Sequence, residues 1–235
     1  MMISAIHQIE MTSRCNLACR YCAHPSMQRD KIHMDGPTYR RALAVAASFV
    51  KRGTQFELNL AGIGESTMHP DFVRNVALAR EAVGWQTRIV LATNGLLLTD
   101  EMAREIAPYR PAVYVSLHRP ERAGPAVEAA RRHGILHGTS TDAATAAIDW
   151  AGQVKWHVSA PPDRVCQWLS MGRVAVLADG RVSRCCLDAS GIGVLGTIWD
   201  DFDTMNTSPY PLCGSCDQAM PAGVARPTLE LVSVQ

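Results

Sequence analysis

The sequence lacks a long apolar run and has almost no excess of charge of either sign. Its 235 residues include 23 basic and 22 acidic side chains, which gives a formal net charge of +1. This balance excludes a basic nucleic-acid-binding arm and an acidic disordered tail, so direct nucleic-acid binding is not indicated, although a local basic patch is compatible with it. No apolar run reaches the roughly 18 residues of a membrane span. Residues 1–7 also lack the features of a secretory signal. We therefore expect a cytoplasmic protein without a membrane partner.

Cysteine is absent from residues 23–165, and the eight cysteines lie in two groups on either side of that gap. The first group contains Cys15, Cys19 and Cys22, and the second contains Cys166, Cys185, Cys186, Cys213 and Cys216. Because the cytoplasm keeps thiols reduced, disulfides are a poor explanation for so many cysteines. Metal binding is the better explanation.

Between the two groups, short β-rich apolar runs alternate with helical patterns. Strands are predicted over residues 6–11, 56–61, 89–92 and 113–117, with weaker candidates over 135–139 and 154–158. Helices are predicted from Pro37 to about Gly53, from Pro70 to Gly84, and after the N-cap residue Thr99. This alternation predicts a parallel sheet with right-handed crossovers. Six such units are too few for a closed eight-fold barrel. The predicted fold class is therefore α/β, with a partial (β/α)6 TIM-like barrel over residues 1–160.

The pattern changes after residue 160. A β-hairpin is predicted with strands over 174–178 and 182–184, joined by a turn at Asp179-Gly180. Irregular sequence follows as far as Cys216. We interpret residues 161–220 as a small cysteine-bearing module and residues 221–235 as a C-terminal tail.

The first cysteine group has the pattern CxxxCxxC and comes directly after the first predicted strand. Barrels of this class carry their chemistry at that end of the strands. Three cysteines within eight residues, beside Arg14 and Arg20, are not typical of core packing. A zinc ion held by these cysteines and His24 is one interpretation. The other is an iron–sulfur cube with three protein ligands, whose fourth iron is open to a cofactor.

This motif, after the first strand of a partial barrel, resembles that of the radical S-adenosylmethionine (SAM) superfamily. The resemblance implies that Cys15, Cys19 and Cys22 hold a [4Fe–4S] cluster and that SAM chelates the open iron. It also implies reductive cleavage of SAM to methionine and a 5′-deoxyadenosyl radical, which abstracts a substrate hydrogen. The expected protein partner is an electron donor such as flavodoxin or ferredoxin.

Later strand ends carry further similarity to the family. Gly62-Ile63-Gly64-Glu65 is similar to the Gly-Gly-Glu-Pro segment that holds the SAM amino group, although Ser66 replaces the proline. The glycines permit close backbone approach, and Glu65 offers an acceptor for an ammonium group. The third strand ends in the polar pair Thr93-Asn94.

The fourth strand ends in Ser116-Leu117-His118, where the family often has Ser-x-Asp in contact with the ribose. His118 departs from that pattern and suits either a bond to ribose or contact with substrate. Tyr21 matches an aromatic position near the adenine. The SAM-binding residues implied by the resemblance are Tyr21, Gly62, Gly64, Glu65, Thr93, Asn94, Ser116 and His118.

The second cysteine group offers four ligands, namely Cys166, Cys185, Cys213 and Cys216. A four-cysteine zinc ribbon would use them equally well. The hairpin, the GxxxxC pattern ending at Cys185 and the late CxxC resemble the twitch module, a shortened SPASM domain, as in radical SAM dehydrogenases of amino sugars. This resemblance implies an auxiliary [4Fe–4S] cluster. The glycine spacing selects Cys185 as the ligand over Cys186, with an exchange of the two roles left open.

A cluster with four cysteine ligands has no open iron and suits electron transfer. The leading hypothesis is therefore a two-electron oxidation of a small-molecule substrate, with the auxiliary cluster as electron acceptor. Such a reaction needs a base near the substrate carbon, and the candidates are His118, Lys155, His157 and Arg164. The alternatives are a redox-neutral rearrangement of a small molecule or nucleoside, modification of a peptide, and a non-catalytic iron–sulfur protein. No motif specifies the substrate.

Overall fold

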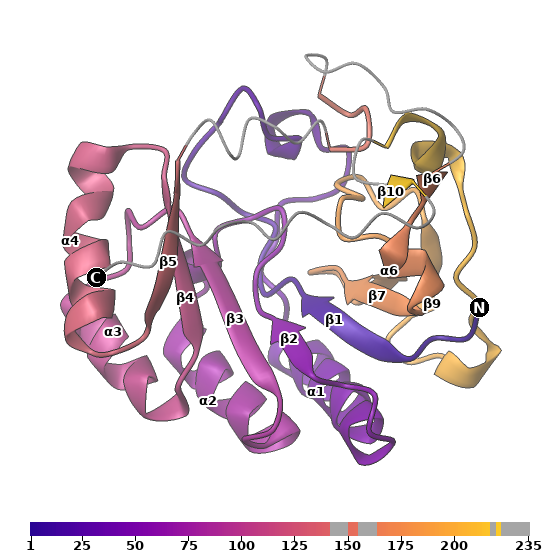
Figure 1. Cartoon of the computed structure of the whole chain (residues 1–235), viewed down its shortest axis with the longest axis horizontal. Helices are drawn as coiled ribbons and strands as arrows, with labels where there is room; N and C mark the ends of the chain where they lie inside the picture. The colour runs from indigo at the N-terminus through magenta and orange to yellow at the C-terminus, as the bar shows by residue number, and fades with distance from the viewer. Residues whose placement is uncertain (142–149, 155–163, 217–219, 222–235) are drawn as a thin grey trace.

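The computed structural model describes residues 1–141, 150–154, 164–216 and 220–221 (Figure 1). Strands and helices alternate in its first part: β1 (Ala5–Ile9), α1 (Gly36–Lys51), β2 (Glu57–Asn59), α2 (Phe72–Val83), β3 (Arg88–Thr93), α3 (Asp100–Ile106), β4 (Ala112–Leu117), α4 (Pro120–Arg132) and β5 (Leu136–Thr141). Shorter elements follow: β6 (Arg164–Val165), α6 (Gln167–Ser170), β7 (Arg173–Val176), β8 (Arg181–Ser183), β9 (Val194–Thr197) and β10 (Met220–Pro221). The 3-10 helices are η1 (His24–Ser26), η2 (Ser66–Met68), η3 (Ala107–Tyr109), η4 (Phe202–Thr204) and η5 (Pro211–Ser215).

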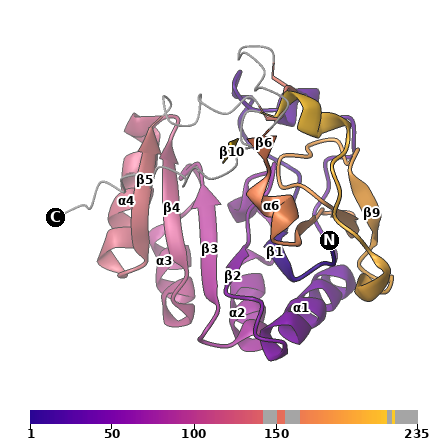
Figure 2. The same ribbon diagram turned by 45° about the vertical axis from the view of Figure 1, so that its right-hand side comes forward.

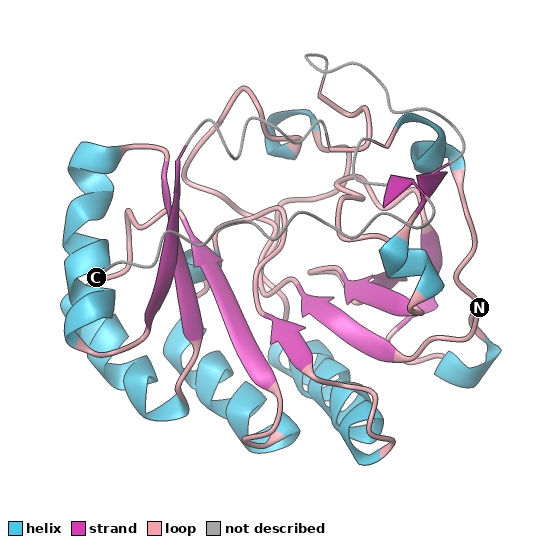
Figure 3. Ribbon diagram, in the orientation of Figure 1, coloured by secondary structure: helices cyan, strands magenta, loops and turns pink. Residues whose placement is uncertain are grey.

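Strands β1 to β5 form a parallel sheet in the spatial order β5-β4-β3-β2-β1. Helices α1 to α4 lie along the outer side of this curved sheet (Figures 1 and 3). The predicted α/β fold with a partial barrel is thereby confirmed. The candidate sixth strand falls almost entirely outside the described residues. Within the described residues, no helix is both long enough and apolar enough to cross a membrane.

Local sequence signals set the ends of the helices. Asp35 accepts a hydrogen bond from the backbone N–H of Thr38 at 2.7 Å and so caps the start of α1. Gly53, just beyond the end of α1, has a φ of 74°, in the left-handed region that glycine adopts readily. Thr99 caps α3 through a bond from the N–H of Met102 at 3.1 Å. The predicted starts and stops of these helices are confirmed.

One hydrophobic core fills the space between the helices and the sheet. Ile6, Leu58 and Ile89, on β1, β2 and β3, are fully buried, and Ala42 and Phe49 on α1 pack against them. This packing fixes the strands side by side, so that their carboxyl ends converge at one edge of the sheet. The loop after β1 lies at that edge (Figure 2).

The predicted hairpin is formed by β7 and β8, and it is continuous with the barrel. Strand β7 pairs in parallel with β1, while β8 and β9 add antiparallel strands, so β9 is the edge of the sheet opposite β5 (Figure 2). Strands β6 and β10 form a separate antiparallel pair. The division of the chain at residue 160 stays a prediction.

Candidate functional site

The loop after β1 carries the first cysteine group. Cys15, Cys19 and Cys22 are all half-buried. The backbone N–H groups of Leu17 and His24 point at the sulfur atoms of Cys15 and Cys22, each at 3.5 Å. Burial raises the pKa of Cys22 to about 11, so a thiolate there needs a positive partner such as a metal centre. Three sulfur donors in one loop, two of which receive N–H bonds, fit an iron–sulfur cluster.

His24 is the fourth ligand in the zinc interpretation. It is buried, and its Nε2 lies 3.0 Å from the carbonyl oxygen of Ser13, so the backbone engages that nitrogen. Over the described ranges, no group of three or more His, Cys, Asp or Glu side chains is arranged to hold a single metal ion.

A cavity of about 190 Å³ opens beside this loop, at the carboxyl ends of the barrel strands. The cavity is lined by Trp150, by the three cysteines and by all eight residues implied to bind SAM, namely Tyr21, Gly62, Gly64, Glu65, Thr93, Asn94, Ser116 and His118. The parallel strands bring these positions together, although they span almost a hundred residues of sequence. Their individual roles in binding stay predictions.

Glu65 joins the second and third strand ends. Its Oε1 accepts hydrogen bonds from the N–H and hydroxyl of Thr67, at 3.1 and 2.6 Å, and from the hydroxyl of Thr93 at 2.7 Å. Its Oε2 accepts the N–H of Asn94 at 2.7 Å. The amide of Asn94 donates to Asn16 at 2.7 Å, which links this network to the cysteine loop. Among the described residues Oε2 receives this single bond, so it retains acceptor capacity for an ammonium group.

Neighbouring protein atoms leave no room for a side chain at Gly62 or Gly64. A Cβ at Gly62 would lie 2.4 Å from Cγ of Glu10, and one at Gly64 would lie 2.3 Å from the carbonyl oxygen of Thr12. The expected close approach is present, but the atoms that approach belong to the loop after β1. Sequence reasoning missed Glu10, whose signal is a carboxylate directly after a buried strand.

Tyr21, His118 and Trp150 form one contact group in this cavity. The hydroxyl of Tyr21 lies 2.6 Å from Nδ1 of His118, and the indole N–H of Trp150 donates to the carbonyl of Tyr21 at 3.1 Å. Ser116 accepts a hydrogen bond from Ser140 at 3.1 Å. His118 thus faces the cysteine loop from the end of β4.

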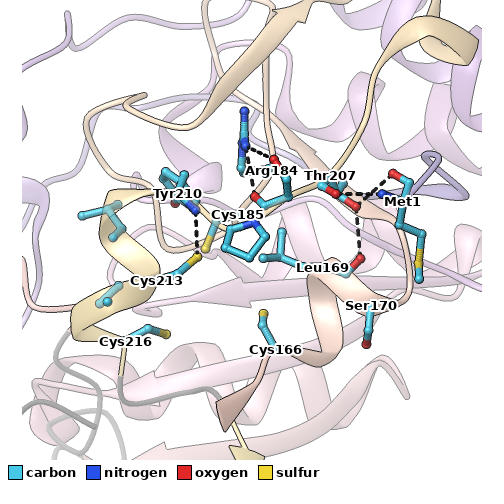
Figure 4. Close-up of a pocket in the computed structure, with 15 residues that line it drawn as sticks. Met1, Cys166, Leu169, Ser170, Arg184, Cys185, Thr207, Tyr210, Cys213 and Cys216 are labelled. Carbon is cyan, nitrogen blue, oxygen red and sulfur yellow. Dashed lines mark hydrogen bonds between the residues drawn. The ribbon is translucent and has the colours of Figure 1, made fainter. Parts of the chain in front are cut away.

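A second cavity, of about 520 Å³, lies in the C-terminal part of the chain. It is lined by the four cysteines predicted as auxiliary ligands: Cys166, Cys185, Cys213 and Cys216 (Figure 4). Cys186 is not among the lining residues. Cys185, the ligand selected by the spacing of the sequence, therefore lines this cavity, and the choice between it and Cys186 stays a prediction.

The sulfur atoms of the second cavity also receive backbone hydrogen bonds. The N–H of Leu187 donates to Cys185 at 3.3 Å, and the N–H of Tyr210 donates to Cys213 at 3.5 Å. A hydrogen bond from Cys186 is the largest of the influences that lower the pKa of Cys185 to about 7. Four sulfur donors around one cavity, two of them with backbone N–H partners, fit a fully cysteine-ligated cluster.

A short turn separates the two cavities. Trp150 lines the first cavity and the next residue, Ala151, lines the second. Both have left-handed backbone conformations, with φ of 55° and 56°, a strain that non-glycine residues tend to carry at functional sites. The amide of Gln153 donates to the carbonyls of Trp150 and Leu187, both at 2.6 Å. No sequence signal identifies this turn.

Of the four candidate bases, the structure describes the side chain of one. The side chain of His118 lies in the first cavity. Lys155 and His157 lie outside the described residues, and Arg164 begins β6 with a side chain that is not described. The choice among them stays a prediction.

Comparison with known proteins places these observations in a family. Residues 9–160 match the model of the radical SAM superfamily. The chain is 37% identical over 102 residues to the tungsten-containing aldehyde ferredoxin oxidoreductase cofactor-modifying protein of Pyrococcus furiosus, covering 42% of this chain and 26% of that protein. It is 33% identical over 98 residues to the mycofactocin maturase MftC of Mycobacterium tuberculosis, covering 42% of this chain and 23% of that one. The matched region is thus about a quarter of the length of these relatives.

Two solved structures share the fold. A crystal structure of BtrN in complex with AdoMet and 2-DOIA superimposes with a TM-score of 0.70 at 18% identity, covering 87% of this chain and 85% of BtrN. The structure of anSMEcpe with bound AdoMet and the Cp18Cys peptide superimposes with a TM-score of 0.59 at 13% identity, covering 84% of this chain and 78% of that one. Because the family model matches well over half of its residues, this chain belongs to the radical SAM superfamily, which implies SAM and a [4Fe–4S] cluster as cofactors.

Proposed function

We propose that this radical SAM enzyme catalyses a two-electron oxidation of a small molecule, with a second [4Fe–4S] cluster as electron acceptor. The observation that carries the proposal is that two cysteine-lined cavities lie on either side of one turn, with Trp150 lining the first and Ala151 the second. A substrate beside this turn would lie between the site of hydrogen abstraction and a site able to take up one electron.

In the first cavity, Cys15, Cys19 and Cys22 would hold the cluster that binds SAM. When bound, SAM and this cluster supply the 5′-deoxyadenosyl radical that removes a substrate hydrogen. Glu65 would accept the SAM ammonium group at Oε2, while its other hydrogen bonds keep the carboxylate fixed. Asn94, held by Asn16, would keep the strand end close to the cysteine loop.

In the second cavity, Cys166, Cys185, Cys213 and Cys216 would hold a cluster with no open iron. Such a cluster supplies an acceptor for the electron left on the substrate radical. The other product of that step is a proton, which a side chain near the substrate must take up. We assign this role to His118, because its Nδ1 lies 2.6 Å from the hydroxyl of Tyr21, which could relay the proton.

The decisive experiment is an iron and sulfide count, with EPR spectra, on anaerobically reconstituted protein. We expect about eight irons per chain, falling to about four when Cys15, Cys19 and Cys22 are all replaced by alanine. The Cys213→Ala variant should also lose one cluster but continue to cleave SAM, without coupling to substrate oxidation. Cys186→Ala is the matched control, and it should keep both clusters because Cys186 does not line the cavity.

Two outcomes would contradict the proposal. About four irons with one zinc would make the C-terminal centre structural and favour a redox-neutral rearrangement. Equal formation of 5′-deoxyadenosine by the wild type and Cys19→Ala would contradict the role of the first cysteine group. With two clusters established, small alcohols, sugars and nucleosides are the compounds to assay, with oxidised product measured against 5′-deoxyadenosine.

A further inference from the structure

Tyr210 lines the second cavity, and its neighbours fix the position of its ring. Its ring lies against Gly193, where an added Cβ would come within 2.6 Å of Cε2, so only glycine leaves room for the ring. The guanidinium of Arg184 lies over the ring, 5.4 Å from its centroid. The ring is thus held by two residues of the segment that joins β8 to β9. Tyr210 itself lines the cavity, as does Cys213 (Figure 4).

The hydroxyl of Tyr210 is buried but has no hydrogen-bond partner of regular geometry among the described residues. Leaving a buried donor unsatisfied is costly, so such groups point to a missing partner. The group beside this hydroxyl is the sulfur of Cys185. Through its backbone N–H, Tyr210 also donates to the sulfur of Cys213 at 3.5 Å. A single residue therefore contacts two of the four cysteines.

The other acidic neighbour is Asp188, and no hydrogen bond joins it to this hydroxyl. The carboxylate of Asp188 already accepts hydrogen bonds from the hydroxyl of Ser183 at 2.8 Å and from the N–H groups of Ile192 and Gly193 at 2.8 and 2.7 Å. A phenol keeps its proton at neutral pH, so the hydroxyl of Tyr210 acts as a donor. The sulfur of Cys185 is the acceptor that its position offers.

We propose that Tyr210 donates a hydrogen bond to the Cys185 sulfur of a cluster held in the second cavity and thereby raises the reduction potential of that cluster. This inference rests on the proposed function. A reduced cluster carries one more negative charge than an oxidised one, so a donor at a ligand sulfur stabilises the reduced form more. Tyr210 would thus be a positioning residue that makes the C-terminal centre a better electron acceptor.

The test is an EPR-monitored redox titration of the full chain, reconstituted with iron and sulfide. Tyr210→Phe keeps the ring and removes only the hydroxyl. We expect its second cluster to be reduced less favourably by about tenfold, a shift of about −59 mV for a one-electron couple. The potential of the first cluster should not move. Tyr39→Phe is the control, because Tyr39 is fully buried and its hydroxyl donates to the carbonyl of Asn75, away from both cavities.

The outcomes separate this inference from the proposed function. Two clusters with unchanged potentials in Tyr210→Phe would overturn the role of Tyr210 and leave the proposed function standing. A wild-type count of four irons would overturn both. If Tyr210→Phe loses its second cluster, the titration is repeated on the wild-type sequence labelled with 3-fluorotyrosine. The phenol of this residue is more acidic and is therefore a stronger hydrogen-bond donor. The second potential should then rise, and an unchanged value would overturn the inference.

Discussion

The pair formed by Glu10 and Arg29 gives the sharpest test of how the site is held together. The Arg29 guanidinium donates to both oxygens of Glu10, at 2.6 and 2.7 Å, and the two side chains are only 4% and 1% exposed, respectively. Glu10 also accepts the N–H of Ile63, in the glycine-rich loop after β2, and the N–H of Ala178, after β7, at 3.0 and 3.1 Å. One carboxylate thus joins three segments of the chain.

Replacing one partner leaves the other charge buried without compensation. We expect Glu10→Gln and Arg29→Met each to lower the free energy of unfolding by about 3–5 kcal/mol. The double variant removes both charges, so its loss should fall short of the sum of the two single losses by at least about 2 kcal/mol. The exposed pair of Arg52 and Asp203, at 2.9 Å, is the control, and Asp203→Asn should cost far less than either single replacement in the buried pair.

The assay is anaerobic urea unfolding followed by far-UV circular dichroism, with all variants at equal iron content. The quantity of interest is the coupling energy of the double-mutant cycle. Additive single effects, with a coupling energy below about 0.5 kcal/mol, would refute the reasoning. So would an effect of Glu10→Gln no larger than that of Asp203→Asn.

Two further predictions concern the SAM-binding loop and the stability of the fold at low pH. Gly64→Ala would place a methyl group 2.3 Å from the Thr12 carbonyl, and should weaken SAM binding by about tenfold or more in equilibrium dialysis. Gly124→Ala, where a Cβ meets nothing within 4 Å, should bind normally, and equal affinities would contradict the packing argument. Burial, assisted by Arg173, lowers the pKa of His7 from 6.5 to about 4. The folded state therefore binds fewer protons than the unfolded state between these pH values, so stability falls by up to about 3 kcal/mol as pH drops from 6.5 to 4. His7→Phe should flatten this dependence in urea unfolding, and an unchanged slope would assign it to other groups.

The sequence by itself determined the elements of the barrel and the composition of both cysteine groups. Caps such as Asp35 and Thr99 act on N–H groups three residues away, so the helix starts are local properties. The alternation of strands and helices predicts that strand ends share one edge, because parallel strands must return through a crossover. This alternation, together with the resemblance to the radical SAM family, assigned residues as distant as Tyr21 and His118 to one site before their contact was known.

Only the tertiary structure decided how that site is supported. The pairing of β7 with β1, the burial of Glu10 against Arg29, and the turn at Trp150 join segments far apart in sequence, and no local pattern records them. The sequence likewise does not record that Cys185 lines the second cavity while its neighbour Cys186 does not. Spacing can name the residues able to bind a cluster, whereas burial and long-range hydrogen bonds determine which groups face it, because these properties arise only when distant segments pack.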